Sequence, residues 1–559
     1  MGTISDKLMR IINTKEDIRQ ALISKGYDVP TSIPFKEYAK MISDLPCRVD
    51  SFPDIEGIVA RYSALGLTNE QMAANPVWVD KTGNGHDIQL KNFSWKGMSG
   101  VGGYGDENYQ TFYKFTLDDY VFIATPPGVK HMNFTFRVTG LQPGNKLTLA
   151  FFGTTNTVYG TWNKDGIYTV DADIVEAGKP TYFYNGYGAT RGEFTIEILP
   201  LYPGALVFDG VDDYGVCDNF PILTKEKGYT VVALRQWIEE KNDSTALVSN
   251  CKNWGQDGAF LFEYNNLRIN FLNVAISFGH VSSVDRGKSP FSYQTSKLYN
   301  GKNIEPESFI GSNELVVGKG SKNFPTVSNF AIWELVFLDH DATEEELTKI
   351  KDYFVKTYPW LFPDQAWTVV GKTNEDEDRA TIANITSNGN DLVLSNFGFI
   401  EGSGYNEEGE YAGYLVTDGV DDKVVSKQFK FGENFTVILD FKFPVKKISY
   451  CGFDLSAKVR IQNLQDSGVY VVLKGNKTLI PSNVVRAVTS EGKVYDENWN
   501  EYNIVPGNIS SNYTMVNLGF DGSIQFAESA TKLAGIYSST LSKDECIKAY
   551  NYLQTLKSK

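Results

Sequence analysis

Two acidic segments are the first candidates for a functional site. The first, Asp-Gly-Val-Asp-Asp, holds Asp209, Asp212 and Asp213, and the same five letters recur from Asp418. Between apolar runs this pattern predicts a tight turn, because glycine adopts positive φ and aspartate side chains accept hydrogen bonds from nearby amides. Three carboxylates within five residues could also help to hold Ca²⁺, which prefers oxygen ligands. The pattern favours a turn and leaves Ca²⁺ binding by the first triplet open; no other cofactor is expected.

Aromatic side chains in polar, Gly-rich or Asn-rich surroundings form a second group. An aromatic ring can stack on the apolar face of a sugar ring, whose hydroxyls point away to the sides. The chain has 31 Tyr, 35 Phe and 9 Trp, so most of its aromatic residues must belong to hydrophobic cores. The candidates for glycan binding are Trp95, Tyr104, Tyr109, Trp254 and Tyr264.

The sequence contains none of the common motifs of hydrolytic enzymes. A glycosidase needs two carboxylates about 5 to 9.5 Å apart, but the strand pattern Glu-x-Asp-x-x-Glu is absent. The four histidines are far apart in the sequence, and no Gly-x-Ser-x-Gly motif offers a serine nucleophile. We therefore expect no catalytic residue and predict that the chain is not an enzyme. A site assembled from separate loops would show no motif, so a polysaccharide-degrading enzyme is kept as a lesser alternative.

Composition limits the class of protein. A length of 559 residues suggests about three or four domains, and 42% hydrophobic residues exclude disorder over most of the chain. The net charge of −15 disfavours binding to nucleic acid. Five scattered cysteines predict neither a disulfide framework nor a zinc site. The N-terminus lacks the apolar segment of a signal peptide, and no stretch of about eighteen apolar residues occurs, so we expect no membrane partner.

Residues 1–46 differ from the rest, because only here do apolar residues recur at helical spacing over consecutive segments. Three short helices are predicted. The segment resembles the N-terminal module of phage tail and appendage proteins. The residues that carry this resemblance are Lys15, Ile18, Ala21, Leu22, Lys25, Gly26, Val29, Pro30, Pro34, Phe35, Tyr38, Ala39 and Ile42. The resemblance implies an end that attaches to a virion; the alternative is a small helical cap on the next domain.

Beyond residue 53 the chain contains a long-period duplication. The segment Asn84–Phe93 matches Asn388–Phe397, and the two acidic segments match each other. Thr343-x-x-Glu346, a helix capping box, matches Ser542-x-x-Glu545. The first two anchors are separated by about 95 more residues in the first copy than in the second. Alternating runs between residues 109 and 200 predict that this excess is an inserted antiparallel β-sandwich.

The segments around Leu206–Asp209, Tyr229–Ala233 and Phe330–Leu338 resemble strands of laminin-G/concanavalin-like jelly rolls. The expected fold is mainly β, with two tandem jelly-roll sandwiches, the first interrupted by a small β-sandwich, after a short α-helical N-terminal segment. The expected domains are a helical docking or oligomerisation segment (1–46), the first jelly roll (53–108 plus 201–362), the insert (109–200) and the second jelly roll (364–556).

These resemblances imply a structural virion protein of a bacteriophage, an appendage or a head or tail fibre. Residues 1–46 would dock on other virion proteins, the chain would form a homo-oligomer, and the lectin-like domains would face outward toward host-surface glycans. The protein would be made in the host cytoplasm and located in the virion. The alternative is a cellular carbohydrate-binding or adhesion protein. Head or tail location, oligomeric state and the identity of any glycan or metal are left open.

Overall fold

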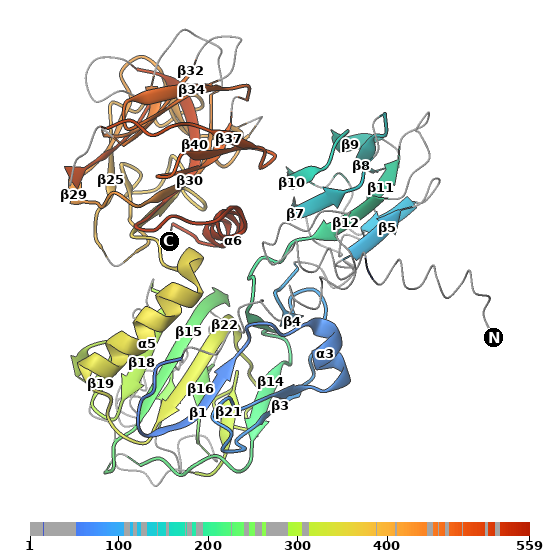
Figure 1. Cartoon of the computed structure of the whole chain (residues 1–559), viewed down its shortest axis with the longest axis vertical. Coiled ribbons are helices and arrows are strands. Elements are labelled where there is room, and N and C mark those ends of the chain that lie inside the picture. Colours follow the sequence, from blue (N-terminus) through green and yellow to red (C-terminus); the bar gives the residue numbers. More distant parts are fainter. Residues whose placement is uncertain are drawn as a thin grey trace, which may run out of the picture. The chain divides into compact units, whose positions relative to one another are not determined.

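The computed structural model describes most of the chain from residue 52 onward (Figure 1). The described residues are 15, 52–104, 112–115, 120–123, 131–141, 144–151, 156–173, 175, 181–185, 194–224, 226–239, 245–251, 260–263, 289–303, 312–386, 388–408, 411–443, 451–456, 458–463, 469–482, 484–508, 513–519 and 526–558. The chain divides into two compact units, Met1–Asp54 and Ile55–Lys559. The predicted helices of residues 1–46 lie outside the described residues, apart from Lys15, which is helical.

The first sandwich has two antiparallel sheets. One sheet follows the order β20-β19-β18-β15-β22-β13-β4, and β1 also pairs with β22. Its strands are β1 (Ile58–Ser63), β4 (Gly100–Val101), β13 (Leu206–Asp209), β15 (Thr230–Glu239), β18 (Phe291–Thr295), β19 (Leu298–Tyr299), β20 (Lys302–Asn303) and β22 (Asn329–Leu338). The other sheet follows the order β17-β16-β21-β14-β3-β2. Its strands are β2 (Val77–Trp78), β3 (Ile88–Lys91), β14 (Tyr214–Cys217), β16 (Val248–Ser249), β17 (Leu261–Phe262) and β21 (Leu315–Val317).

A smaller sandwich is inserted between β4 and β13. Its sheets follow the orders β10-β7-β12-β5 and β6-β11-β8-β9. Its strands are β5 (Phe112–Phe115), β6 (Tyr120–Ile123), β7 (His131–Thr139), β8 (Leu147–Phe151), β9 (Thr157–Trp162), β10 (Gly166–Asp173), β11 (Thr181–Asn185) and β12 (Phe194–Ile198). Phe136 lies at the centre of its core, where its ring contacts those of Trp162, Tyr168 and Phe183. This segment therefore has a hydrophobic core of its own.

The second sandwich again has two large antiparallel sheets. One follows the order β26-β27-β40-β30-β35-β36-β37, with β23 also paired to β40, and the other follows β24-β25-β28-β39-β31-β32-β33-β34. The strands are β23 (Gln365–Thr368), β24 (Thr381–Ile382), β25 (Leu392–Ser395), β26 (Gly404–Tyr405), β27 (Leu415–Asp418), β28 (Lys423–Ser426), β30 (Thr436–Lys442), β31 (Cys451–Leu455), β32 (Val459–Asn463), β33 (Val469–Leu473), β34 (Asn476–Ile480), β35 (Val485–Thr489), β36 (Lys493–Asp496), β37 (Glu501–Asn503), β39 (Val516–Leu518) and β40 (Glu528–Tyr537). A short ladder joins β29 (Phe429–Lys430) to β38 (Tyr513–Thr514).

The two large sandwiches contain equivalent strands in the same register. β3 and β25 alternate identically between buried and exposed residues, as a half-buried strand should. β14 pairs with β3 so that Tyr214 faces Lys91, and β28 pairs with β25 so that Lys423 faces Ser395. These four residues occupy the positions that the aligned sequence anchors assign to one another. The structure confirms the predicted mainly β fold of tandem sandwiches, the first one interrupted by a smaller sandwich.

The central strand pairs, β15 with β22 and β30 with β40, also have equivalent registers. Thr230 faces Leu338 between β15 and β22, and Thr436 faces Tyr537 between β30 and β40. In both ladders the register shifts by one residue, after Leu234 in the first and after Asp440 in the second. A bulge at the same place shows that even an irregularity of the sheet is shared.

One helix follows the last strand of each large sandwich: α5 (Glu344–Thr357) and α6 (Lys543–Gln554). Both begin with the predicted capping box, in which the Thr343 or Ser542 side chain accepts from the backbone of Glu346 or Glu545 and the glutamate side chain accepts in return. The short helix α3 (Asn69–Ala74) precedes β2, and the 3₁₀ turn η2 (Pro359–Leu361) joins the two copies. In the part of the chain that the structure describes, no helix is long and apolar enough to cross a bilayer.

A buried ion pair lies beneath each of these helices. In the first sandwich Arg61 Nη2 lies 3.2 Å from Glu334 Oε2, and Tyr358 OH donates to Glu334 Oε1 at 2.7 Å. In the second sandwich Arg486 pairs with Asp440, which also accepts from Tyr550 OH at 3.1 Å. The carboxylate lies on β22 in the first copy and on the neighbouring strand β30 in the second.

The two cores hold different aromatic residues at one equivalent position. Tyr62 on β1 donates its hydroxyl to the His86 carbonyl, and Trp367 on β23 donates its indole N–H to the Asn390 carbonyl at 2.9 Å. Both rings are buried, and both polar atoms reach a carbonyl at the same place in the loop before β3 or β25. A phenol and an indole can replace each other here because each has an apolar body and a donor at its tip.

Candidate functional site

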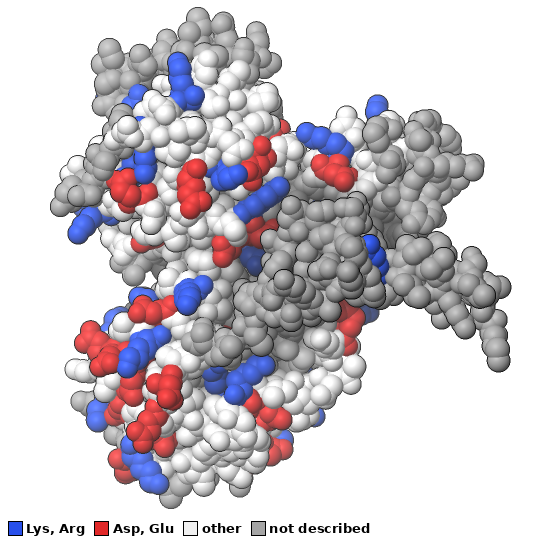
Figure 2. Space-filling model, in the orientation of Figure 1, with Lys and Arg blue, Asp and Glu red and all other residues white. Residues whose placement is uncertain are grey.

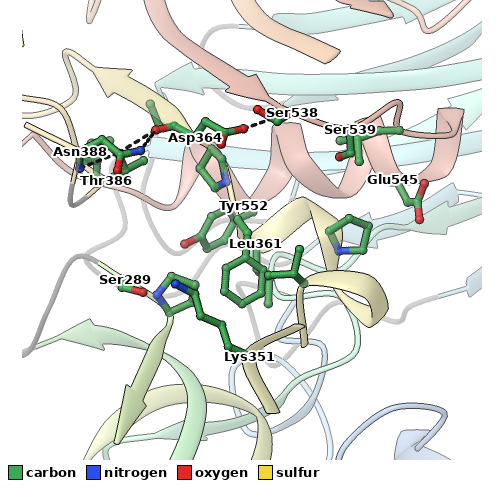
Figure 3. A pocket seen from close by; sticks show the side chains of 18 of the residues that line it. Ser289, Lys351, Leu361, Asp364, Thr386, Asn388, Ser538, Ser539, Glu545 and Tyr552 are labelled. Carbon is green, nitrogen blue, oxygen red and sulfur yellow. Dashed lines mark hydrogen bonds between the residues drawn. The ribbon is translucent and has the colours of Figure 1, made fainter. Parts of the chain in front are cut away.

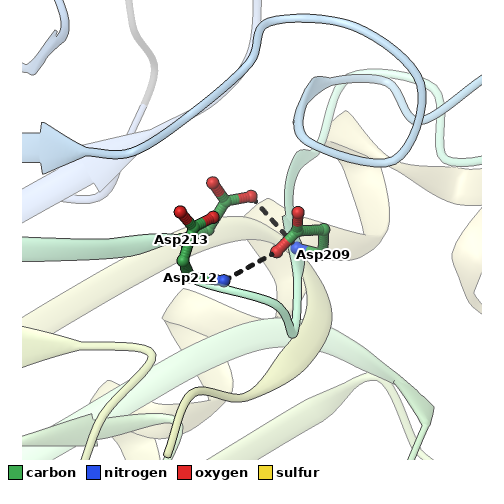
Figure 4. Close-up of side chains that lie close together, drawn as sticks. All are labelled: Asp209, Asp212 and Asp213. Atoms are coloured by element: carbon green, nitrogen blue, oxygen red, sulfur yellow. Dashed lines mark hydrogen bonds between the residues drawn. The ribbon is translucent and has the colours of Figure 1, made fainter. Parts of the chain in front are cut away.

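The acidic segment at residues 209–213, here called the Asp209 turn, connects β13 to β14. Asp209 Oδ1 accepts from the backbone N–H of Val211 at 2.7 Å. It also accepts from Asp212 N at 3.4 Å, while Asp213 Oδ2 accepts from Asp209 N at 3.1 Å (Figure 4). Gly210 has φ +73°, and a Cβ there would lie 2.6 Å from Asn329 Cβ. The segment therefore forms the predicted tight turn, and local amides use several of its carboxylate oxygens.

Asp213 is the buried member of this turn. Its Oδ1 accepts from Ser99 Oγ at 3.0 Å, so both oxygens of the carboxylate have protein donors. Burial, followed by the nearby charge of Asp209, raises the pKa of Asp213 to about 7. Asp212 is exposed. The turn thus holds one carboxyl that is partly protonated at neutral pH beside one that faces solvent.

The second copy repeats this arrangement at residues 418–422, the Asp418 turn. Asp418 Oδ1 accepts from Val420 N at 2.8 Å and Asp421 N at 3.3 Å, and Asp422 Oδ2 accepts from Asp418 N at 2.8 Å. Ser403 Oγ donates to Asp422 Oδ1 at 3.1 Å. Burial raises the pKa of Asp422 to about 6. The shared hydrogen bonds indicate that both turns are maintained by the same local interactions.

The carboxylates of each turn also lie close enough to one another to contact one ion. One ligand oxygen from each residue of either triplet lies within 4.8 Å of the others. Ca²⁺ needs six to eight oxygen ligands, and donors of the turn and of Ser99 already use three of the six carboxylate oxygens of the Asp209 turn. The hydrogen bonds alone account for the turn. Ca²⁺ binding by Asp209, Asp212 and Asp213 stays a prediction.

Trp95 lies on the neighbouring loop between β3 and β4, residues 92–99, here called the Trp95 loop. Its ring stacks on Phe93 with centroids 4.9 Å apart and an interplanar angle of 18°, and Phe93 in turn contacts the core ring of Phe208. The indole is half-buried, and its N–H makes no hydrogen bond to another described residue. Its backbone has φ +59°, a conformation that bulky side chains rarely adopt. The ring is therefore covered by Phe93 on one face, and both residues pack against the core of the first sandwich.

Hydrogen bonds join the Trp95 loop to the Asp209 turn. Asn92 Nδ2 donates to the Asp212 carbonyl at 3.0 Å. Ser99 Oγ accepts from Ser94 N at 2.8 Å and donates to Asp213. The loop and the turn consequently form one hydrogen-bonded surface, here called the rim, which includes the half-buried indole of Trp95 and the exposed residue Asp212.

The second copy has an equivalent loop between β25 and β26 at residues 396–403, the Phe399 loop. Phe399 has φ +50° and takes the place of Trp95, with Phe397 in the place of Phe93. Asn396 Nδ2 donates to the Asp421 carbonyl at 3.0 Å, as Asn92 does in the first copy. The guanidinium of Arg379 lies 5.0 Å from the Phe399 ring centroid. The two rims share their construction but differ in the ring and in this added cation.

Exposed aliphatic side chains stand at equivalent places on both turns. Val211 is 75% exposed and Val420 is 71% exposed, and Ile400 on the Phe399 loop is 64% exposed. Isolated exposed valines are ordinary, but here one stands at the tip of each acidic turn, beside an aromatic loop. Each rim thus presents both apolar surface and carboxylate.

The structure places the other predicted aromatic residues differently. Tyr104 is half-buried against the core of the inserted sandwich, and burial raises its pKa to about 12. Its backbone N–H donates to the Gly97 carbonyl at 2.7 Å, which holds it at the base of the Trp95 loop. Tyr109, Trp254 and Tyr264 lie outside the described residues. Of the five candidates, only Trp95 has a described position on the rim.

A cavity that sequence reasoning missed lies where the two copies join. This junction pocket has a volume of about 610 Å³, and α5, the segment around η2, two loops of the second sandwich and α6 line it (Figure 3). Asp364, three residues after the end of η2, accepts at its carbonyl from Asn388 Nδ2 and at Oδ2 from Ser538 N. The lining comes from segments far apart in the sequence, so no local motif could have revealed it.

Comparisons with known proteins give weak structural similarities only. No family model and no curated protein matches the chain. A Trypanosoma rangeli sialidase bound to a difluorinated keto-deoxynononic acid matches over 40% of this chain and 41% of its own, with 10% identity and a TM-score of 0.25. An arabinofuranosidase bound to arabinofuranosyl-xylobiose matches over 32% and 50%, with 14% identity and a TM-score of 0.23. The binding domain of Paraclostridial Mosquitocidal Protein 1 matches over 33% and 51%, with 14% identity and a TM-score of 0.21. The matched region thus spans about half or less of each of these chains.

One prediction from the sequence must be corrected. The absence of a catalytic motif led us to predict that the chain is not an enzyme, whereas the solved structures that it resembles include glycosidases. The prediction is wrong in its reasoning, because loops from several strands can bring catalytic groups together without any linear pattern. Similarity at this level assigns neither a reaction nor a catalytic residue to the chain.

Proposed function

We propose that the protein binds carbohydrate, and that the rim formed by the Trp95 loop and the Asp209 turn is a binding surface, with an equivalent rim in the second copy. One observation carries the proposal. Two sandwiches that differ in most of their residues both hold a half-buried aromatic residue with positive φ beside an acidic turn: Trp95 at +59° and Phe399 at +50°.

The cost of this backbone conformation makes the observation informative. A bulky residue in the left-handed region costs on the order of 1 to 3 kcal/mol, and asparagine or glycine would fit there with less strain. Asn92 and Asn396 adopt it within the same two loops, at φ +67° and +70°. Since a residue better suited to the backbone is available, retention of a ring at both positions favours a role for the ring itself.

The chemistry of the rim suits a sugar. The Trp95 ring stacks on Phe93 and packs against the core of the first sandwich, and the part of this half-buried ring that stays exposed can receive the C–H face of a pyranose. Asp212 is exposed within the adjoining turn, and its carboxylate can accept hydrogen bonds from sugar hydroxyls. On the face drawn in Figure 2, acidic and basic side chains are interspersed and form no large patch of one sign. Because the exposed carboxylate of Asp212 would repel an anionic sugar, a neutral glycan suits the rim better than a strongly anionic one.

The substitution Trp95→Asn tests the proposal. Asparagine tolerates the left-handed backbone, and this relief offsets part of the packing lost with the indole, so the variant should still fold while it lacks the ring. Removal of a stacking ring should make the free energy of binding less favourable by about 1 kcal/mol, which corresponds to roughly fivefold weaker binding per site. A glycan array probed with the chain displayed multivalently should show reduced signal for Trp95→Asn and retained signal for Trp95→Phe.

The same design applies to Phe399→Asn in the second copy, and the double variant should lose more signal than either single one. A double variant that folds normally and binds every glycan as the wild type does would refute the proposal for both rims. The array should be repeated with a chelator, because loss of binding on chelation would bring the predicted Ca²⁺ into the interaction.

The virion role implied by residues 1–46 stays a separate prediction. Those residues lie outside the described part of the chain, except Lys15, so it is supported by the sequence resemblance alone. Carbohydrate binding does not depend on it, because the rims belong to the unit Ile55–Lys559. A cellular adhesion protein and a particle-borne one would both use the rims as proposed.

A further inference from the structure

The junction pocket has the dimensions of a ligand site. Its volume of about 610 Å³ falls within the range of pockets that enclose small molecules, roughly 300 to 1,000 Å³. Figure 3 shows Tyr552 of α6 near the middle of the group, with Asp364 and Ser538 on one side and Lys351 of α5 extending toward Ser289 on the other. Both copies and the segment that joins them therefore contribute to one cavity.

The charges that line the pocket balance. Lys351 and Lys356 on α5 stand against Asp364 and Glu545 from the second copy. Neither lysine forms an ion pair with a described residue, and each carboxylate is held by the protein through one oxygen: Asp364 Oδ2 accepts from Ser538 N, and Glu545 Oε2 accepts from Ser542. A lining with no net charge favours a neutral ligand.

Several polar groups in the pocket have no protein partner among the described residues. The hydroxyls of Ser538 and Ser539 make no hydrogen bond to another described side chain or backbone group, and neither does the phenol of Tyr552. Burial raises the pKa of Tyr552, so its hydroxyl keeps its proton and can donate. Together with the lysines and the second oxygens of the carboxylates, the pocket offers both donors and acceptors.

Apolar surface alternates with these groups. Leu361 and Phe362 contribute an aliphatic and an aromatic side chain, and Val355 is 38% exposed at the α5 wall. A ligand that fits must present hydroxyls in several directions and apolar C–H faces between them. Pyranose rings have this character, whereas a fully apolar ligand would leave the free donors unsatisfied.

We propose that the junction pocket binds a short neutral oligosaccharide. The ligand class rests on the proposed function, but the site is separate from both rims and involves neither Trp95 nor Phe399. The pocket would enclose a few sugar units, whereas the rims would contact the surface of a longer chain. Binding in the pocket would also hold the two copies together, because α5 and α6 both contribute to its lining.

The test uses the full chain and three neutral probes, cellotetraose, maltotetraose and chitotetraose, each titrated by calorimetry and by saturation-transfer NMR. At least one should bind saturably. Val355→Trp should fill the α5 side of the pocket and weaken binding at least tenfold. Ser538→Ala with Ser539→Ala should weaken it about fivefold to tenfold by removing two hydroxyls.

Leu479→Trp is the matched control. Leu479 is 40% exposed, much like Val355, but it lies on β34 and does not line the pocket, so the variant should bind as the wild type does. Trp95→Asn should likewise retain pocket binding. Absence of saturable binding by all three sugars up to about 10 mM, where even millimolar sites fill, would overturn the proposal. Binding lost in Trp95→Asn but unchanged in Val355→Trp would also overturn it, while it would support the rim.

Discussion

Replacement of Asp213 by asparagine should remove a loss of stability that the first sandwich undergoes as the pH rises. Burial raises the pKa of Asp213 from 3.8 to about 7, with a further contribution from the charge of Asp209. The folded state therefore binds this proton more tightly than the unfolded chain does. The stability that the group contributes is fully present below about pH 4 and is lost as the pH rises through about 7.

The size of the effect follows from the shift. A difference of about three pKa units, at about 1.4 kcal/mol each, corresponds to about 4 kcal/mol in the free energy of unfolding. Asparagine mimics the protonated acid, because its oxygen can accept from Asp209 N while its amide donates to the Ser99 hydroxyl. The variant should match the wild type near pH 4 and exceed it by up to about 4 kcal/mol at pH 8.

The measurement is urea unfolding at intervals from pH 4 to pH 8, read by hydrogen exchange of peptides that cover β13 and β14. A local probe is needed because a chain of several domains does not unfold in one step. Asp212→Asn is the control, because it removes an exposed charge that helps to raise the pKa of Asp213. In this variant the stability should still fall as the pH rises, but over a slightly lower pH range. A pH-independent difference for Asp213→Asn, or a variant less stable than the wild type at pH 8, would refute the reasoning. If millimolar Ca²⁺ stabilises only the wild type at pH 8, the Asp209 turn holds the ion.

Two further predictions concern the ends of the described unit. Ser542→Ala removes the capping box of α6 and should lower the free energy of unfolding of the second sandwich by about 1 kcal/mol, whereas Ser542→Thr should retain most of it, as urea titration would show. Deletion of residues 1–46 should leave the unit Ile55–Lys559 folded, with unchanged circular dichroism and unchanged binding in the glycan array. If residues 1–46 dock on a virion, mass spectrometry of purified particles should find the full chain and miss the truncated one; incorporation of both at equal level would rule out that role.

Local patterns predicted the elements that local interactions build. The capping boxes at Thr343 and Ser542 and the two acidic turns were recognisable because their hydrogen bonds join residues within five positions of each other. The duplication could be predicted from three anchors, since β3 and β25 keep the same alternation of buried and exposed residues. Register, in contrast, depends on partners far apart in the sequence, and the shared bulge after Leu234 and Asp440 has no local signal.

The candidate sites could be predicted only in part, for the same reason. Trp95 was singled out by its polar surroundings, but Phe399 was overlooked, although it follows the matched segment Asn388–Phe397 by only two residues. Tyr104 has similar surroundings to Trp95 in the sequence, yet it packs on the core of the inserted sandwich. The junction pocket combines residues from 289 to 556, and only the folded chain brings them together.

The buried ion pairs have a consequence for how a chain with two related sandwiches avoids exchanging strands. In the first copy Glu334 on β22 faces Leu234 on β15. In the second copy Asp440 on β30 faces Leu533 on β40. Since β22 corresponds to β40 and β15 to β30, the acid and the leucine lie on opposite strands in the two copies. Were β22 to pair with β30, Glu334 would face Asp440, and two carboxylates would be buried together. The reciprocal pairing of β15 with β40 would bring two leucines together and supply no carboxylate. A buried charge without its partner costs several kcal/mol, so pairing between β22 and β30 would be unfavourable. During folding, each half of the chain would therefore pair its own strands in preference to those of the other half.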